Sequence, residues 1–190
     1  MKFITAFKAL AALTLLILVS ACEPNKQKES VEIAKDVNDA VMDDRDEEKD
    51  ADFIVNTIAD TYAEVKLAQL ALSRSSDDGV KKMATMLEAD HAKIITELKG
   101  YASKNGITVP LEETDDAKGE YNNLASEKEL NDFDEKWCDK LADSHEETIN
   151  SLEKRLDKTE DVELKNWITA TLPGLKSHLE MLRTNEARLK

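Results

Sequence analysis

Three histidines are the residues of this sequence best suited to chemistry, because each falls in the apolar stripe of a different expected helix. They are His91, His145 and His178, and the chain contains no other histidine. Apolar residues recur three, four and seven positions away from each, a spacing that keeps side chains on one helix face. Glu64 occupies the same place in the stripe of a preceding helix. Because burial of an unpaired polar group is costly, these side chains should pair with one another, with water or with a metal ion.

The positions of these four side chains along their helices predict that they meet. At a rise of about 1.5 Å per residue, each lies roughly 18–26 Å from a helix end, near the middle of the expected bundle. Glu88 precedes His91 by three residues, which is the Glu-x-x-His spacing of ligands in di-iron helical bundles. Sets rich in imidazole favour iron, zinc or copper over calcium or magnesium. The candidate metal ligands are therefore Glu64, Glu88, His91, His145 and His178.

Four long amphipathic segments must position these residues. Turn signals separate them, namely the Ser-Ser-Asp-Asp-Gly run at 75–79 and the Asn105-Gly106 pair, which Pro110 follows. The long helices are expected over residues 52–75, 78–104, 132–157 and 161–190, with one short helix near 117–126. Pro173 removes a backbone donor, so it should interrupt and kink the last helix.

The order of these segments predicts an all-α fold. Glycine, proline and aromatic residues are scarce, whereas Glu, Lys, Leu and Ala dominate, which is typical of long helices with few turns. Short connections should place the first two long helices antiparallel, and likewise the last two. The longer connection at 106–132 then joins the two hairpins. We therefore expect an antiparallel four-helix bundle with ferritin-like connectivity, formed by residues 51–190.

The N-terminal 22 residues predict export and a lipid anchor. Lys2 and Lys8 precede an apolar run over residues 9–19. This run is too short for a membrane-spanning helix but has the length of a signal-peptide core. The small residues before Cys22 resemble the lipobox of bacterial lipoproteins. This resemblance implies cleavage after Ala21, so that residues 1–21 are a lipoprotein signal peptide and Cys22 carries lipid. The alternative is an uncleaved anchor, or a secretory signal followed by a coincidental cysteine.

Residues 22–50 are expected to form an acidic linker between the lipid and the folded domain. This segment has many acids and few large apolar groups, so it should be mostly disordered. Val31, Ile33, Val37 and Val41 could form one weak helical face. The predicted mature protein is then tethered to a membrane through Cys22, at the periplasmic face or in the outer membrane of a bacterial cell envelope.

The net charge limits the kinds of partner that the chain can bind. The formal charge is −14, and removal of the signal peptide takes away Lys2 and Lys8 and no acid, which makes it −16. Such a surface repels nucleic acid and anionic lipid headgroups, so attachment to a membrane must come from the acyl chains. Cys138 is the only other cysteine, so the mature chain cannot form an internal disulfide once Cys22 is lipidated.

Several motifs, taken in order, resemble the bacterial family known as domain of unknown function 4142. They are Ala63-Glu64-Val65-Lys66-Leu67, Met83-Ala84-Thr85-Met86 before Asp90-His91, Gly106-Ile107-Thr108-Val109-Pro110, Phe133-Asp134 before His145-Glu146, and Leu172-Pro173-Gly174-Leu175-Lys176-Ser177-His178-Leu179. The resemblance covers about residues 52–182. It implies a ferritin-like helical fold and a place in the periplasm or outer membrane, and it implies no settled activity.

The sequence departs from the ligand pattern of a ferritin-type di-iron site. Such a site needs two Glu-x-x-His pairs, but Ala142 stands three residues before His145 and Leu175 three before His178. Only the Glu88–His91 pair has the required spacing, which argues against ferroxidase chemistry.

Two functions follow from these features. The first is a non-enzymatic cell-envelope lipoprotein with a role in binding or stress tolerance, in which a Glu–His network only fixes the register of the helices. The alternative is a metal-binding or redox bundle that uses the Glu/His cluster. No catalytic residue is predicted, because no serine or cysteine forms a recognisable nucleophile motif with a histidine.

Overall fold

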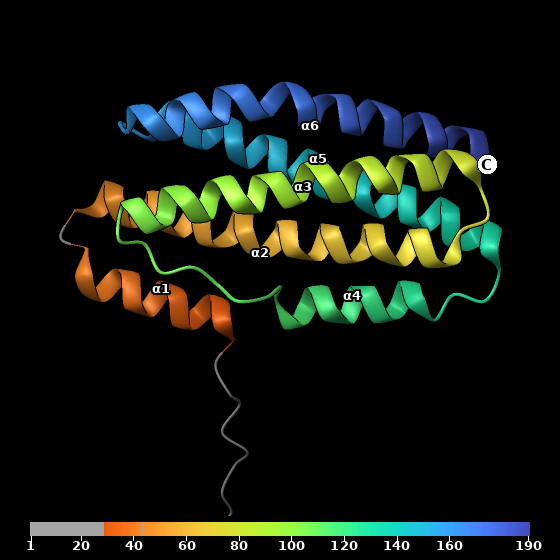
Figure 1. Cartoon of the computed structure of the whole chain (residues 1–190), viewed down its shortest axis with the longest axis horizontal. Helices are drawn as coiled ribbons and strands as arrows, with labels where there is room; N and C mark the ends of the chain where they lie inside the picture. The colour runs from red at the N-terminus through yellow and green to blue at the C-terminus, as the bar shows by residue number, and fades with distance from the viewer. Residues whose placement is uncertain (1–28, 43) are drawn as a thin grey trace, which may run out of the picture.

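The computed structural model describes residues 29–42 and 44–190, and these form six α-helices and no strand. The helices are α1 (Ser30–Val41), α2 (Arg45–Arg74), α3 (Asp78–Lys104), α4 (Asp115–Ala125), α5 (Leu130–Lys158) and α6 (Val162–Leu189) (Figure 1). The prediction of an all-α fold is confirmed. None of the helices in this part of the chain is both long and apolar enough to cross a membrane.

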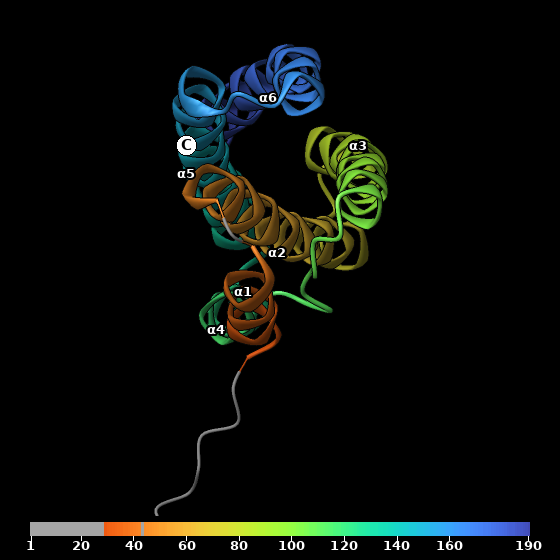
Figure 2. The same cartoon turned by 90° about the vertical axis from the view of Figure 1, so that its left-hand side faces the viewer.

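Four long helices pack side by side as two hairpins. Helix α2 pairs with α3, and α5 pairs with α6, while contacts of α2 with α5 and of α3 with α6 join the hairpins (Figures 1 and 2). Aspartates start the second helix of each hairpin, since Asp77 accepts a hydrogen bond from the backbone of Val80 and Asp161 accepts one from Leu164. Gly106, at a φ of +69°, follows the end of α3.

The helix boundaries match the expected ones with two exceptions. Helix α2 begins at Arg45 rather than near residue 52, so it runs back into the expected linker. Helix α6 continues through Pro173 instead of being interrupted there. Pro173 is exposed, and Leu172 and Leu175 on either side of it are buried in the core. We attribute the continuity of α6 to this packing, which offsets the one backbone hydrogen bond that proline removes.

The apolar core consists of two clusters, one in each half of the bundle. One cluster includes Leu87, Phe133, Trp137, Leu141 and Leu182, and the indole Nε1 of Trp137 donates a hydrogen bond of 2.8 Å to the carbonyl of Leu67. The other includes Ile54, Ile58, Leu98, Leu152, Leu164 and Ile168. On each long helix, the candidate site residue lies between the members of the two clusters. The core therefore holds a polar layer between two apolar layers.

Helix α1 corrects the prediction of a mostly disordered tether over residues 22–50, because residues 30–41 and 45–50 are helical. Val31 and Ala34 pack on Val55 and Ala59 of α2. The side chain of Asn38 donates to the carbonyl of Thr108 at 3.0 Å and accepts from its backbone nitrogen at 2.8 Å. Two small apolar contacts and one paired amide thus hold a segment whose composition alone suggested disorder.

The other three members of the expected apolar face of α1 do not enter the core. Ile33, Val37 and Val41 are 48%, 41% and 65% exposed. The predicted signal peptide, residues 1–21, and the predicted lipidation site Cys22 lie outside the described residues.

Replacement of Asn38 by alanine should loosen α1 from the bundle. The change removes both hydrogen bonds to Thr108, so we expect a loss of about 1–3 kcal/mol from the free energy that holds α1 in place. Amide hydrogen exchange over residues 31–41 should become faster, while exchange in α3 and α5 stays unchanged. Asp39→Ala, at an exposed neighbouring position, is the control. Equal protection of α1 in both variants would show that Asn38 does not hold the helix.

Candidate metal centre

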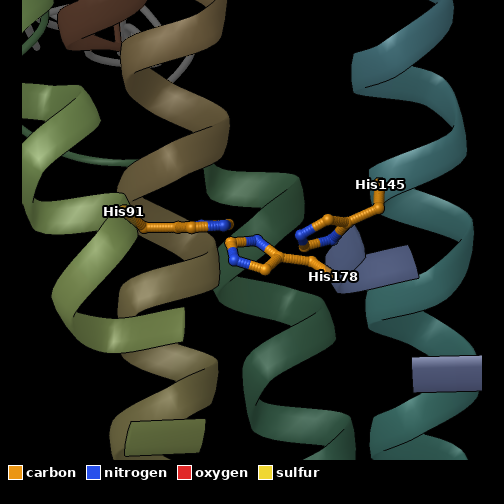
Figure 3. Close-up of side chains that lie close together, drawn as sticks. All are labelled: His91, His145 and His178. Atoms are coloured by element: carbon orange, nitrogen blue, oxygen red, sulfur yellow. The ribbon is translucent and has the colours of Figure 1, made fainter. Parts of the chain in front are cut away.

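The three histidines meet in the polar layer, each from a different helix. His91 comes from α3, His145 from α5 and His178 from α6, and their ring centroids are 5.2, 5.6 and 5.6 Å apart. Each ring offers one nitrogen to a set of three atoms that all lie within 4.8 Å of one another. The rings converge on one point (Figure 3). The side chains are buried, with residue exposures of 1%, 0% and 4%.

One nitrogen of each ring faces an oxygen atom outside the triad. Nδ1 of His145 lies 2.8 Å from the carbonyl oxygen of Leu141, which can only accept, so this nitrogen carries the proton. Nε2 of His178 lies 3.1 Å from Oδ2 of Asp90. Nδ1 of His91 lies 2.7 Å from Oε2 of Glu64, within ion-pair distance but off the hydrogen-bond axis.

The second nitrogen of each ring is buried without a hydrogen-bond partner among the described residues. These atoms are Nε2 of His91, Nε2 of His145 and Nδ1 of His178. Histidines that bind metals almost always contact a carboxylate or a backbone carbonyl with the nitrogen that is not coordinated. The triad has this arrangement, and its three free nitrogens have the chemistry of ligands for one ion.

Glu64 supports the triad from α2. It is 4% exposed, it accepts a hydrogen bond of 2.6 Å from the hydroxyl of Ser144, and its Oε1 lies 3.4 Å from Nδ1 of His145. Burial by itself raises the pKa of Glu64, but the imidazoles of His91 and His145 and the hydrogen bonds outweigh it, so the pKa lies below its ordinary value. Glu64 is therefore a buried carboxylate that stays ionised beside the rings.

His145 and His178 favour the neutral state. Burial lowers the pKa of His145, and the neighbouring His91 adds to this effect while Glu64 opposes it. Burial likewise lowers the pKa of His178, with the same effect from the other two rings and an opposing one from Asp90. Neutral imidazole is the form that can bind a metal ion, so burial keeps His145 and His178 in that form near neutral pH.

The structure brings together four of the five predicted ligands and leaves Glu88 apart. Oε1 of Glu88 accepts a hydrogen bond of 2.9 Å from Gln69 at the edge of the α2–α3 hairpin. Leu87 and His91, one helical turn apart, are the residues of α3 that point inward here, and Glu88 lies on the flank of that stripe. The metal-ligating role of the other four residues stays a prediction.

Sequence reasoning missed two residues that contact the cluster. Asp90 is adjacent to His91 in the chain but contacts His178 of another helix. Ser144 is adjacent to His145 but donates its hydrogen bond to Glu64. Both lie next to a candidate histidine in the sequence, and this adjacency could have pointed to them. Which neighbouring helix each side chain contacts depends on how the helices are rotated about their axes, and helical periodicity alone does not fix that rotation.

The free energy of unfolding of the metal-free protein should fall as the pH is lowered from 7.5 to 5.5. Unfolded histidines bind protons near pH 6.5, whereas folded His145 and His178 bind them only at lower pH. Protons therefore favour the unfolded chain in this window, and stability is lost as the pH falls. Thermal unfolding across the window measures the effect.

Asp60 provides a control of opposite sign. Asp60 is exposed, but partial loss of hydration around its carboxyl, together with the charges of Glu64 and Glu147, raises its pKa to about 6. The folded state therefore binds this proton more tightly than the unfolded state and gains stability as the pH falls. Asp60→Asn should consequently steepen the loss of stability below pH 6. A melting temperature that stays constant between pH 7.5 and 5.5 in both proteins would contradict the burial of neutral histidines.

Comparison with known proteins places this chain in a family. A protein-family profile described as domain of unknown function (DUF4142) matches residues 37–184, which include α2 to α5 and most of α6. No match was found among curated proteins or among solved structures. The matched segment begins within α1, in agreement with the observed extension of the helical domain toward the N-terminus. The chain therefore belongs to the DUF4142 family.

Proposed function

We propose that this protein is a cell-envelope lipoprotein whose helical bundle binds one divalent transition-metal ion through His91, His145 and His178. The observation that carries the proposal is the set of three buried imidazole nitrogens that face one another without hydrogen-bond partners. Left empty, such a set costs the desolvation free energy of three acceptors. A bound ion would satisfy all three at once.

The charges around the triad favour a divalent ion. Imidazoles that coordinate an ion are neutral and contribute no charge, whereas Glu64 beside His91 and Asp90 beside His178 contribute one negative charge each. An ion of charge +2 would therefore be balanced by the two carboxylates that hold its ligands. Imidazole ligands suit zinc, copper or iron, and three of them leave a further coordination position open.

We propose binding of the ion rather than catalysis as the role of the site. The three ligands are at most 4% exposed, so a bulky substrate could not contact an ion held between them. A redox role for the ion is the alternative that this geometry leaves open. The proposal thus combines the non-enzymatic envelope role of the first hypothesis from the sequence with the metal site of the alternative.

The ferritin-like four-helix bundle is part of this proposal. Two antiparallel hairpins joined by the long α3–α5 connection support it. The site differs from a di-iron centre, because Glu88 points away and Ala142 and Leu175 stand where further carboxylates are needed. One ion rather than two is therefore proposed, without ferroxidase chemistry.

Elemental analysis of the mature chain, made soluble by Cys22→Ser and prepared without a tag, tests the site. We expect one zinc or copper ion per chain after exposure to the metal and gel filtration. His178→Gln should abolish stoichiometric binding, because only two of the three imidazole ligands would remain to hold the ion. Glu64→Gln should weaken binding by roughly 10–100-fold, the usual effect of changing an outer contact of a ligand.

Glu88→Gln is the matched control, since Glu88 precedes His91 by three residues yet contacts Gln69, and it should leave the affinity unchanged. A chain that takes up no metal, and whose histidine variants change only the melting temperature, would establish the purely structural network instead.

The anchor is tested by comparing the two cysteines of the chain. We expect full-length protein produced in a bacterial host to incorporate labelled palmitate and to sediment with membranes. Cys22→Ser should lose the label, because the thiol that would carry the acyl chain is absent. Cys138→Ser, which changes a buried core residue, should keep the label. Palmitate incorporation that persists in Cys22→Ser would overturn the lipoprotein assignment.

A further inference from the structure

A groove on the surface between α3 and α6 reaches one of the three candidate ligands. It has a volume of about 250 Å³. Its lining includes Asp90, Ile94 and Glu97 from α3, and Thr171, Gly174 and His178 from α6. Figure 2 views the bundle along its length and shows α3 and α6 as the two helices that close the ring of long helices.

His178 separates this groove from the interior of the triad. Its Nε2 faces Asp90, a residue that also lines the groove and whose side chain is 54% exposed. Its Nδ1 is buried without a partner, and the ring points toward His91 and His145 (Figure 3). One aromatic ring thus stands between solvent and the three converging nitrogens.

A second recess approaches the triad from the side of α2 and α5, and Glu64 is part of its lining. This cleft, between α2, α4 and α5, is lined by Glu64 and Ser144. Glu64 accepts a hydrogen bond from Ser144 and contacts the rings of His91 and His145. To let an ion pass, Glu64 would have to give up these contacts while its carboxylate is still buried, and an unpaired buried charge is costly. Asp90 is already half in water, so its displacement breaks one contact and buries nothing.

We propose that the metal ion reaches the triad through the α3–α6 groove, with Asp90 as the carboxylate that first contacts the ion and His178 as the ligand that it meets first. This inference rests on the proposed metal-binding function. Glu97, the other acid of the groove, accepts a hydrogen bond from Trp167 and pairs with Lys93 at 3.7 Å. Asp90 contacts the imidazole of His178 and no lysine or arginine within ion-pair distance among the described residues, so it offers the more available negative charge to a cation.

Gly174 allows the groove to be filled without a change to any ligand. It lines the groove one helical turn before His178, and a Cβ at this position would meet nothing within 4 Å. Gly174→Phe should therefore be accommodated and should cover the approach to His178. Gly100 of α3 also has open space around an added Cβ but lies outside this groove, so Gly100→Phe is the matched control.

The experiment follows Zn²⁺ uptake in a stopped-flow instrument, with release from a fluorescent chelator as the signal, and uses the mature chain with Cys22→Ser. Gly174→Phe should slow uptake roughly tenfold, because binding must then wait for a rarer opening of the groove. The amount of zinc bound at equilibrium should stay the same. Gly100→Phe should bind at the rate of the parent protein, and Asp90→Asn should also bind more slowly.

The outcomes separate the route from the site. If the parent protein binds no zinc at equilibrium, the proposed function itself is overturned. If binding is intact but Gly174→Phe leaves the rate unchanged, the groove is not the route. Asp60→Asn and Glu147→Gln change acids that line the opposite cleft. Slower uptake in these variants, with an unchanged rate in Gly174→Phe, would assign the route to that cleft. Gly174→Leu serves as a second, smaller filling of the groove should the phenylalanine variant fail to fold.

Discussion

The meeting of three buried imidazoles inside the bundle is the constraint on which the rest of this structure depends. Each ring has one nitrogen directed at an oxygen atom and another directed at the other rings, where no hydrogen-bond partner exists within the described residues. This arrangement fixes the rotation of three helices about their axes, because a turn of any one would remove its ring from the layer. Glu64 adds the same constraint for α2.

Apolar packing on both sides of the layer offsets the cost of burying its polar groups. Two apolar clusters enclose it, with Trp137 and Leu141 on one side and Ile58 and Leu152 on the other. The two clusters bury the apolar surface that stabilises the fold, which the polar layer itself does not provide. They also keep water away from the imidazoles, which strengthens the influence of Glu64 on its neighbours. This enclosure lowers the pKa of His145 and of His178, whereas Glu64 stays ionised despite its burial because of its contacts with the rings and with Ser144.

Much of the fold could be predicted because its signals are periodic and local. Apolar stripes and turn residues located α3, α5 and α6, and equal heights along the helices predicted that His91, His145 and His178 would meet. The predictions that failed were those that depend on tertiary contacts. Asn38 docks α1 through a loop residue 70 positions away, and composition carries no trace of that pairing. Glu88 and Asp90 both lie within three residues of His91, and only packing decides that Asp90 joins the site.

The division of the core into two apolar halves has a consequence for cooperativity. Each half has its own hydrophobic cluster, and the layer between them offers few apolar contacts that would couple their opening. An ion held by α3, α5 and α6 at that level would bind only when both halves are folded around it. It would therefore stabilise the whole bundle by mass action and make the two halves unfold as one unit.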